Sequence, residues 1–309
     1  MEKFRKVSII KRMTMPQDQL QQYHQELRKY ECDCPIKGIK LRQILHGAVL
    51  LCVKIECLLS GVRVKVVGDE RIPTNKPIIY ACTHIGRYDV ESNFLSLNDH
   101  FYILYGDPRD VYRSLDGLLL NLNGVIYVDT DSKDDRFIGK ENCVKLLKKG
   151  GSLLIYPEGA WNITSNQAVM KLFTGSVEMA IRSEAQIVPI AMENQGNSYY
   201  VNIGKNIDYA HASLTQKREL SDQLRDIMCT LKWEIWEKVG MQKRSSIPIK
   251  YEDIFLDKIM SQTVSGYTVE EIERTRYQDK NIQSQEEVFA FREKLNPSKS
   301  NTFLLRNNK

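Results

Sequence analysis

The chain lacks the cysteine spacing that a structural metal site or a disulfide framework requires. Its seven cysteines are an odd number, and no two of them form a C-x-x-C pair. The stretch MEKFRKVSIIKRM at the start also has no apolar core of the secretory type. We therefore expect no bound metal and no disulfide framework, with reduced thiols in the cytoplasm.

No apolar run is long and uninterrupted enough to predict a secure transmembrane helix. The longest, residues 44–62, is broken by His46, Lys54 and Glu56. A helix there can pack its apolar side on the core, or lie in a bilayer interface beside the basic start of the chain. The sequence does not separate these two positions. We expect peripheral contact with the inner face of a membrane, which the net charge of +5 suits, although many enzymes carry as much.

Several enzyme signatures are also missing. The sequence has neither G-x-G-x-x-G nor G-x-x-x-x-G-K-[ST], which argues against a nucleotide-binding α/β enzyme. It has no G-x-S-x-G elbow, and Cys82 lies on an expected strand, where a thiol packs in the core more readily than it acts as a nucleophile. Nothing in the sequence suggests a nucleic-acid partner.

What the sequence does contain is an alternation of short apolar runs with amphipathic segments. Residues 61–68 alternate valine with charged residues, which predicts an edge strand with one wet face. The alternation predicts an α/β fold with a central mixed sheet flanked by helices. Further strands are expected at 78–83, 101–105, 124–128, 152–156, 187–192 and 199–203.

The composition divides the chain into three parts. Residues 1–60 are a basic, helical segment with expected membrane-surface contact, and residues 61–245 hold the α/β domain. Within that domain, residues 214–239 have the pattern of a long amphipathic helix. Residues 246–309 are charged, poor in glycine and weakly periodic, which predicts a helical, polar C-terminal extension.

The stretch THIGRYD pairs a histidine with an aspartate five positions later. Residues five apart on a helix diverge by about 140°, so His84 and Asp89 meet only if His84 lies in the loop before the helix and Asp89 in its first turn. Such a pair is a general base held by a carboxylate. Capping of the helix start explains Asp89 equally well. Without an enzyme nucleophile, the substrate must supply one, as a hydroxyl or an amine.

Three polar residues follow apolar runs and are expected to share one crevice. His84, Asp129 and Glu158 each stand at or just after the end of an expected strand. Ligand sites of α/β sheets gather at such loops.

Four blocks in chain order carry a resemblance to a known family. They are THIGRYD, GVIYVDT at 124–130, YPEGAWN at 156–162 and IVPI at 187–190. Together they resemble the motif blocks of the glycerolipid acyltransferases, the 1-acylglycerol-3-phosphate acyltransferase-like or PlsC-type domain. The resemblance covers about residues 60 to 210.

This resemblance implies a reaction and a set of residues. A hydroxyl of a lysophospholipid or related lipid acceptor would attack acyl-CoA or an acylated carrier protein, a co-substrate in place of a cofactor. His84 would be the base that deprotonates the hydroxyl, and Asp89 would orient it. The substrate-binding set carried over from the blocks is Thr83, Arg87, Asp129, Pro157, Glu158, Gly159 and Pro189.

Two positions depart from the family pattern. Members that acylate lysophosphatidate usually carry arginines where this chain has Thr130 and Trp161. Arginine binds a phosphate monoester through paired charge-assisted hydrogen bonds, which neither replacement can supply. The sequence therefore predicts an acceptor without that phosphate, unless Arg87, Arg109, Arg113 or Arg136 replaces the charge. N-acylation of an amine and an inactive lipid-binding protein on the same fold remain as alternatives.

Overall fold

The computed structural model divides the chain into two compact units, residues 1–277 and 278–309. Almost all residues that can be described belong to the first unit. The described residues are 7–106, 111, 114–165, 167–240, 244–262, 268–278 and 298.

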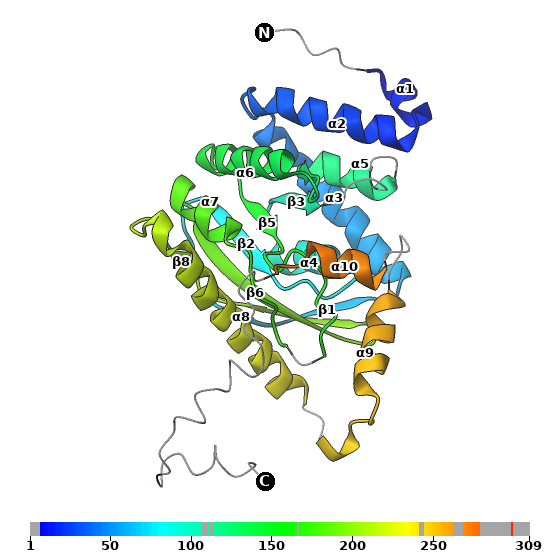
Figure 1. Ribbon diagram of the computed structural model, residues 1–309, viewed down its shortest axis with the longest axis vertical. Helices are drawn as coiled ribbons and strands as arrows, with labels where there is room; N and C mark the ends of the chain where they lie inside the picture. The colour runs from blue at the N-terminus through cyan, green and yellow to red at the C-terminus, as the bar shows by residue number, and fades with distance from the viewer. Residues whose placement is uncertain are drawn as a thin grey trace. The chain divides into compact units, whose positions relative to one another are not determined.

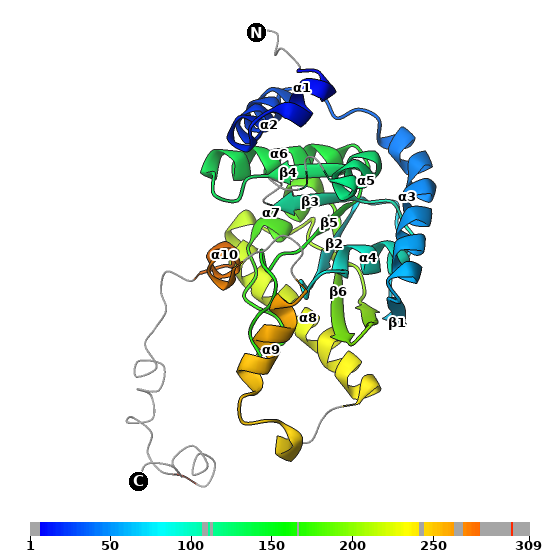
Figure 2. The ribbon, with the colours of Figure 1, turned by 90° about the vertical axis from the view of Figure 1, so that its right-hand side faces the viewer.

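An eight-stranded sheet forms the centre of the first unit, in the order β1-β7-β6-β2-β5-β3-β4, with β8 paired to β6 (Figures 1 and 2). β6 pairs antiparallel with β7 and β8, whereas the other pairs are parallel, so the sheet is mixed as predicted. β1 lies at the edge, also as predicted. The strands are β1 (Arg63–Asp69), β2 (Ile78–Cys82), β3 (Tyr102–Gly106), β4 (Val125–Val128), β5 (Leu153–Ile155), β6 (Gln186–Gln195), β7 (Ser198–Ile203) and β8 (Ile207–Asp208).

Helices cover both faces of the sheet. Alternate residues of a strand point to opposite faces, so Ile79 joins the core under α6, α7 and α8, whereas Tyr80 and Cys82 join the core under α3, α4 and α5. The thiol of Cys82 is therefore in the core, as its position predicted. The helices are α1 (Ile9–Thr14), α2 (Gln17–Cys32), α3 (Ile39–Leu59), α4 (Asp89–Leu97), α5 (Leu115–Asn123), α6 (Lys133–Lys148), α7 (Gly175–Ser183), α8 (Lys217–Val239), α9 (Tyr251–Met260) and α10 (Val269–Thr275), with short 3-10 turns at Leu214–Gln216 and Arg244–Ser246.

Helix α3 includes most of the interrupted apolar run. Its buried side places Val49, Val53 and Cys57 against the core. Its other side leaves Ile44 77% and Leu58 79% exposed. Packing on the core and an apolar outer surface are thus properties of the same helix. Among the described residues, no helix has both the length and the apolar character needed to span a bilayer.

The C-terminal part of the first unit contains helices α8, α9 and α10. Helix α8 matches the long amphipathic helix expected at 214–239 and buries Leu224, Met228 and Ile235. Helices α9 and α10 follow within the expected extension, and most of its remainder lies outside the described residues.

Candidate active site

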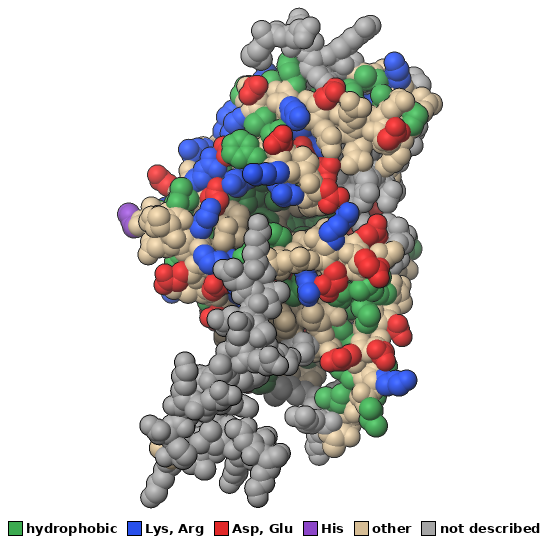
Figure 3. All heavy atoms as spheres, in the orientation of Figure 1, with side chains coloured by type: hydrophobic (Ala, Val, Ile, Leu, Met, Phe, Trp, Pro, Cys, Tyr) green, Lys and Arg blue, Asp and Glu red, His purple; other side chains and the backbone are tan. Residues whose placement is uncertain are grey.

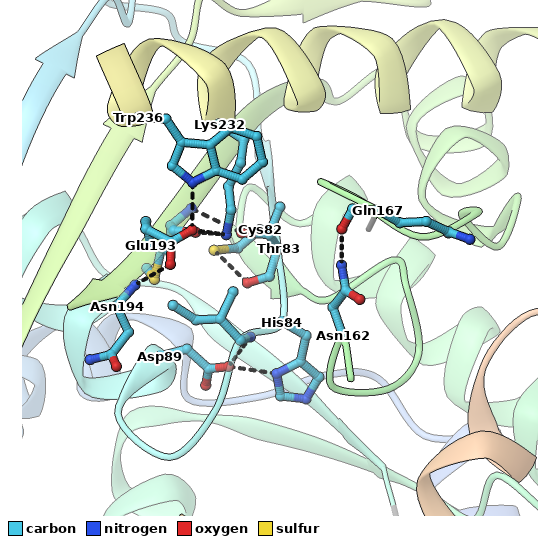
Figure 4. A network of polar contacts seen from close by, with 12 residues as sticks. Cys82, Thr83, His84, Asp89, Asn162, Gln167, Glu193, Asn194, Lys232 and Trp236 are labelled. Carbon is cyan, nitrogen blue, oxygen red and sulfur yellow. Dashed lines mark hydrogen bonds and ion pairs between the residues drawn. The ribbon is translucent and has the colours of Figure 1, made fainter. Parts of the chain in front are cut away.

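His84 and Asp89 meet in the loop between β2 and α4, as their spacing predicted. Nδ1 of His84 lies 2.5 Å from Oδ2 of Asp89 (Figure 4). β2 ends at Cys82 and α4 begins at Asp89, so the histidine stands in the loop and the aspartate in the first helical turn. The His84 side chain is 22% exposed, whereas that of Asp89 is 2% exposed. The imidazole can therefore reach a substrate while its carboxylate partner stays in the interior.

The carboxylate of Asp89 faces the loop and not the helix it begins. Its Oδ2 accepts hydrogen bonds from the backbone amides of Ile85 at 3.2 Å and Gly86 at 3.4 Å. The N-cap residue of α4 is Tyr88, which makes no side-chain capping bond. Asp89 thus orients the histidine and its loop, and helix capping does not account for its position.

Glu158 and Asn162, from the loop after β5, hold the backbone on both sides of the imidazole. Oε1 of Glu158 accepts from the His84 amide at 3.0 Å, and Oε2 accepts from the Met170 amide at 2.7 Å. The amide of Asn162 donates to the His84 carbonyl at 2.9 Å. Complete burial raises the pKa of Glu158 to about 7, although the two amide bonds oppose the shift.

The turn at Pro157 to Gly159 brings these groups into place. Gly159 has φ +78°, and a side chain there would collide with the Phe173 ring. The Pro157 carbonyl accepts from the Phe173 amide at 2.8 Å. The third block therefore shapes the loop that braces His84.

Two aromatic side chains surround the imidazole. Tyr156 stacks on His84 with ring centroids 4.2 Å apart and planes 16° from parallel, and Asn93 donates to its hydroxyl at 3.2 Å. Trp161 stands edge-on to His84 at 6.1 Å. No local sequence pattern predicts the contact of Tyr156 with the histidine, because the two residues stack across two separate loops.

A charged network lies behind the site. The sequence patterns did not predict it. Lys232 of α8 pairs with Glu193 at 3.1 Å and donates to the Met192 carbonyl (Figure 4). Nε1 of Trp236 donates to the same oxygen of Glu193, Oε2, at 2.8 Å. Burial would raise the pKa of Glu193, but the charge of Lys232 and the hydrogen bonds from Trp236 and Lys232 together lower it. The sequence signal for this network was the spacing of Lys232, which stands four residues after the buried Met228 and therefore on the same side of the helix.

The remaining predicted residues lie around this centre in different ways. The buried Thr83 accepts from the Met192 amide at 2.9 Å, and Pro189 pairs with Ala81 in the sheet, so both connect β2 to β6. The guanidinium of Arg87 is exposed, 5.0 Å from the Tyr88 ring.

Asp129 is engaged away from the histidine. Its carboxylate accepts from Gln25 at 2.5 Å and Gln21 at 3.2 Å, both on α2. It follows β4, which is three strands from β2 in the sheet and therefore about 14 Å away. The structure thus brings His84, Asp89 and Glu158 together and joins Asp129 to the N-terminal helices. The expectation of one crevice for His84, Asp129 and Glu158 does not hold for Asp129.

A cluster of metal ligands is not seen in the described part of the chain, where no three His, Cys, Asp or Glu side chains are placed to hold an ion. In this mixed sheet, a partly exposed histidine and a buried carboxylate are in contact just after the end of β2. A family model described as Acyltransferase matches residues 63–193.

Relatives and a solved structure agree with this match. The chain is 27% identical over 188 residues to a 1-acyl-sn-glycerol-3-phosphate acyltransferase of Borreliella burgdorferi, covering 57% of this chain and 74% of the relative. It is 23% identical over 144 residues to an enzyme of the same name from Chlamydomonas reinhardtii, covering 44% of this chain and 40% of the relative. The crystal structure of the 1-acyl-sn-glycerophosphate acyltransferase PlsC from Thermotoga maritima has a similar fold, with a TM-score of 0.53 at 13% identity over 72% of this chain and 91% of that one. The family model and the two relatives agree on an acyltransferase of the PlsC, 1-acylglycerol-3-phosphate type, and the solved structure shares its fold.

Proposed function

We propose that this acyltransferase moves a fatty acyl group from an acyl thioester to a hydroxyl of a lysophospholipid or related lipid acceptor. The donor is acyl-CoA or an acylated carrier protein. The observation that carries the proposal is the contact between His84 Nδ1 and Asp89 Oδ2 at 2.5 Å. With Nδ1 engaged, Nε2 is left for the substrate, and it makes no hydrogen bond within the described residues.

The chemistry follows from this tautomer. Nε2 of His84 takes the proton of the acceptor hydroxyl while the oxygen attacks the thioester carbonyl carbon. The buried carboxylate of Asp89 stabilises the imidazolium that forms. The tetrahedral intermediate then collapses by breaking the C–S bond, and the imidazolium returns its proton to the departing thiolate.

The surroundings of the base favour an acceptor other than a phosphate monoester. Trp161 presents an indole beside His84 at the position where lysophosphatidate-acylating members usually carry arginine. An aromatic surface suits a sugar, a zwitterion or an apolar stem better than a dianion. We therefore place the enzyme in lipid metabolism, in phospholipid biosynthesis or a related step.

Access to a lipid acceptor favours attachment to a membrane surface. The outer side of α3 exposes Ile44, Leu58 and Leu59, the last at 82%. Lys37 and Lys40 stand exposed near the start of this helix. An apolar side flanked by basic residues is typical of a helix that lies in an anionic bilayer interface. We propose peripheral binding there, on the cytoplasmic side of a membrane.

The decisive experiment is a transfer assay with purified protein, a labelled acyl thioester, and a panel of lysolipids, glycolipids and amino lipids. Mass spectrometry of the product identifies the acceptor and distinguishes an ester from an amide. Formation of an acyl ester on a lysolipid supports the proposal. Thioester hydrolysis alone, or an amide product, contradicts it.

A further inference from the structure

A segment outside the matched acyltransferase region lies over the candidate active site. We call residues 251–262 and 268–277 the C-terminal cover. Its first helix, α9, is fixed to the end of β6, because Lys258 donates to the Asn194 carbonyl at 3.2 Å. Ile259 of the same helix is buried.

The second helix of the cover, α10, packs on the third sequence block. Ile272 is buried in one cluster with Ala160 and Met170, and Trp161 packs against that cluster. A side chain on Gly159 would come within 3.0 Å of the Thr275 carbonyl oxygen. The cover thus contacts the residues that directly follow Glu158.

Two further contacts hold the end of the cover in place. The Tyr277 ring stands edge-on to Phe173 with centroids 5.4 Å apart. Arg274 pairs with Asp131 at 3.3 Å, in the loop after β4. The cover therefore reaches the loops after β4 and β5, and the resemblance implies that the loop after β5 places the acceptor.

One polar side chain of the cover points at the loop between β2 and α4, which carries His84 and is called the catalytic loop below. Gln262 is the second residue after α9, and its backbone amide donates to the Ile259 carbonyl at 3.0 Å. Its side-chain oxygen Oε1 is buried and has no hydrogen-bond partner in the described part of the chain. This oxygen lies directly over Gly86, where any side-chain carbon would collide with it. Gly86 is two residues from His84.

A buried amide oxygen without a partner is unfavourable for folding, so its retention calls for an explanation. We propose that Gln262 binds the polar head group of the acyl acceptor and that the C-terminal cover forms the acceptor wall of the active site. This inference rests on the proposed function and adds a specificity-determining residue to it. The bond is made by the substrate, which supplies the donor that the protein lacks.

The chemistry of Gln262 narrows the class of acceptor. A carbonyl oxygen accepts a hydrogen bond, so the head group must offer a hydroxyl or an ammonium N–H. A phosphate dianion offers neither. Acidic side chains also gather around α10 in Figure 3, and Glu270 and Glu271 stand in its first turn. Basic side chains stand beside them, with Arg274 on the same helix and Lys171 over the Tyr277 ring, so the charge around α10 does not by itself select the head group. The acceptor is therefore a lysolipid with a hydroxylated or amino-bearing head group.

The test compares Gln262→Ala and Gln262→Glu with Ser261→Ala. Ser261 is the adjacent cover residue, but its exposed hydroxyl bonds to the Lys258 carbonyl and not to the catalytic loop. KM and kcat are measured for the best hydroxylated or amino-bearing lysolipid, for its counterpart methylated at those donors, and for the acyl thioester. Thermal unfolding is followed for each variant.

We expect Gln262→Ala to lower kcat/KM for the donor-bearing lysolipid by about tenfold, through KM of the acceptor, and to leave KM of the thioester unchanged. The methylated counterpart should be a poor substrate of the wild type and insensitive to Gln262→Ala. Gln262→Glu keeps an accepting oxygen and should retain more activity than Gln262→Ala. Ser261→Ala should match the wild type, and neither Gln262→Ala nor Ser261→Ala should unfold at a lower temperature.

Equal losses for both lysolipids and the thioester, or no change in acceptor KM, would overturn the role of Gln262. A Gln262→Ala protein that unfolds earlier than the wild type would also count against it, because an unpaired oxygen should add no stability. These results are distinct from failure of the proposed function, in which the wild type itself transfers no acyl group to any lysolipid.

Discussion

Oε1 of Glu158 accepts a hydrogen bond from the backbone amide of His84 at 3.0 Å, so a buried carboxyl group from the third block holds the loop that carries His84. The Glu158 side chain is fully buried. It therefore helps to fix the position of His84, and its ionisation affects the stability of the fold.

The first prediction concerns the catalytic pair. His84→Ala should lower kcat/KM for acyl transfer by about a hundredfold or more, because the acceptor hydroxyl loses its base. Asp89→Asn should also reduce the rate, since the amide does not stabilise an imidazolium. Steady-state kinetics with the best acceptor measures both effects. His211→Ala, at an exposed histidine, is the matched control and should be unchanged.

Near wild-type turnover in His84→Ala would refute the mechanism. Circular dichroism and thermal unfolding of the same preparation show whether a loss of rate reflects chemistry or folding.

The second prediction follows from the pKa of Glu158. Burial raises this pKa from 4.5 to about 7, so folding favours the protonated form. Protonated Glu158 stabilises the fold relative to ionised Glu158. This stabilisation is complete below about pH 4.5, decreases as the pH rises, and is lost above about pH 7. The free energy of unfolding should fall by an amount on the order of 3 kcal/mol across this window.

Glu158→Gln tests this pH dependence because the amide does not ionise. The variant should be less stable overall at low pH, since its NH2 group faces a backbone N–H where an oxygen accepted before. Its free energy of unfolding should nevertheless change less than that of the wild type between about pH 5 and pH 8. Urea unfolding at both pH values provides the comparison. The same pH slope in both proteins would show that another group titrates.

Much of the fold could be predicted from local sequence, and the site only in part. The strand at 78–82 and the helix from Asp89 follow from hydrophobic periodicity and a helix start, which are local properties. The meeting of His84 and Asp89 followed from the same information. The separation of Asp129 from them did not, because it depends on the position of β4 in the strand order.

The residues that sequence reasoning missed act over long separations. Tyr156 reaches His84 from the loop directly after the neighbouring strand β5, and Lys232 reaches Glu193 from helix α8. Gln262 belongs to the C-terminal extension, for which the sequence predicted only polar, helical structure. Such contacts depend on tertiary packing, which a single sequence does not record.

The third prediction concerns membrane binding by α3. Ile44→Glu and Leu58→Glu place a charge on its exposed apolar side and should each weaken partition to anionic vesicles by about tenfold. Gln223→Glu, at an exposed position of α8, makes the same kind of change elsewhere and should have little effect. Flotation with vesicles measures the bound fraction. Salt should weaken binding only partly, because apolar contact remains.

Unaltered flotation of both α3 variants would show that the protein meets the membrane by another surface. Release of the wild type only by detergent would contradict peripheral binding.

The last prediction concerns the phosphate of the acceptor. Since Trp161 stands edge-on to His84 at 6.1 Å, Trp161→Arg brings a guanidinium to the site where it can bind a phosphate monoester. The variant should increase kcat/KM for lysophosphatidate relative to a zwitterionic lysolipid by about tenfold. The wild type should prefer the zwitterionic or uncharged acceptor at fixed donor and salt. A wild-type preference for lysophosphatidate would mean that other residues bind the phosphate. Arg87, which is exposed beside Tyr88, and Arg136, whose guanidinium donates to the Thr130 carbonyl, are then the first positions to replace.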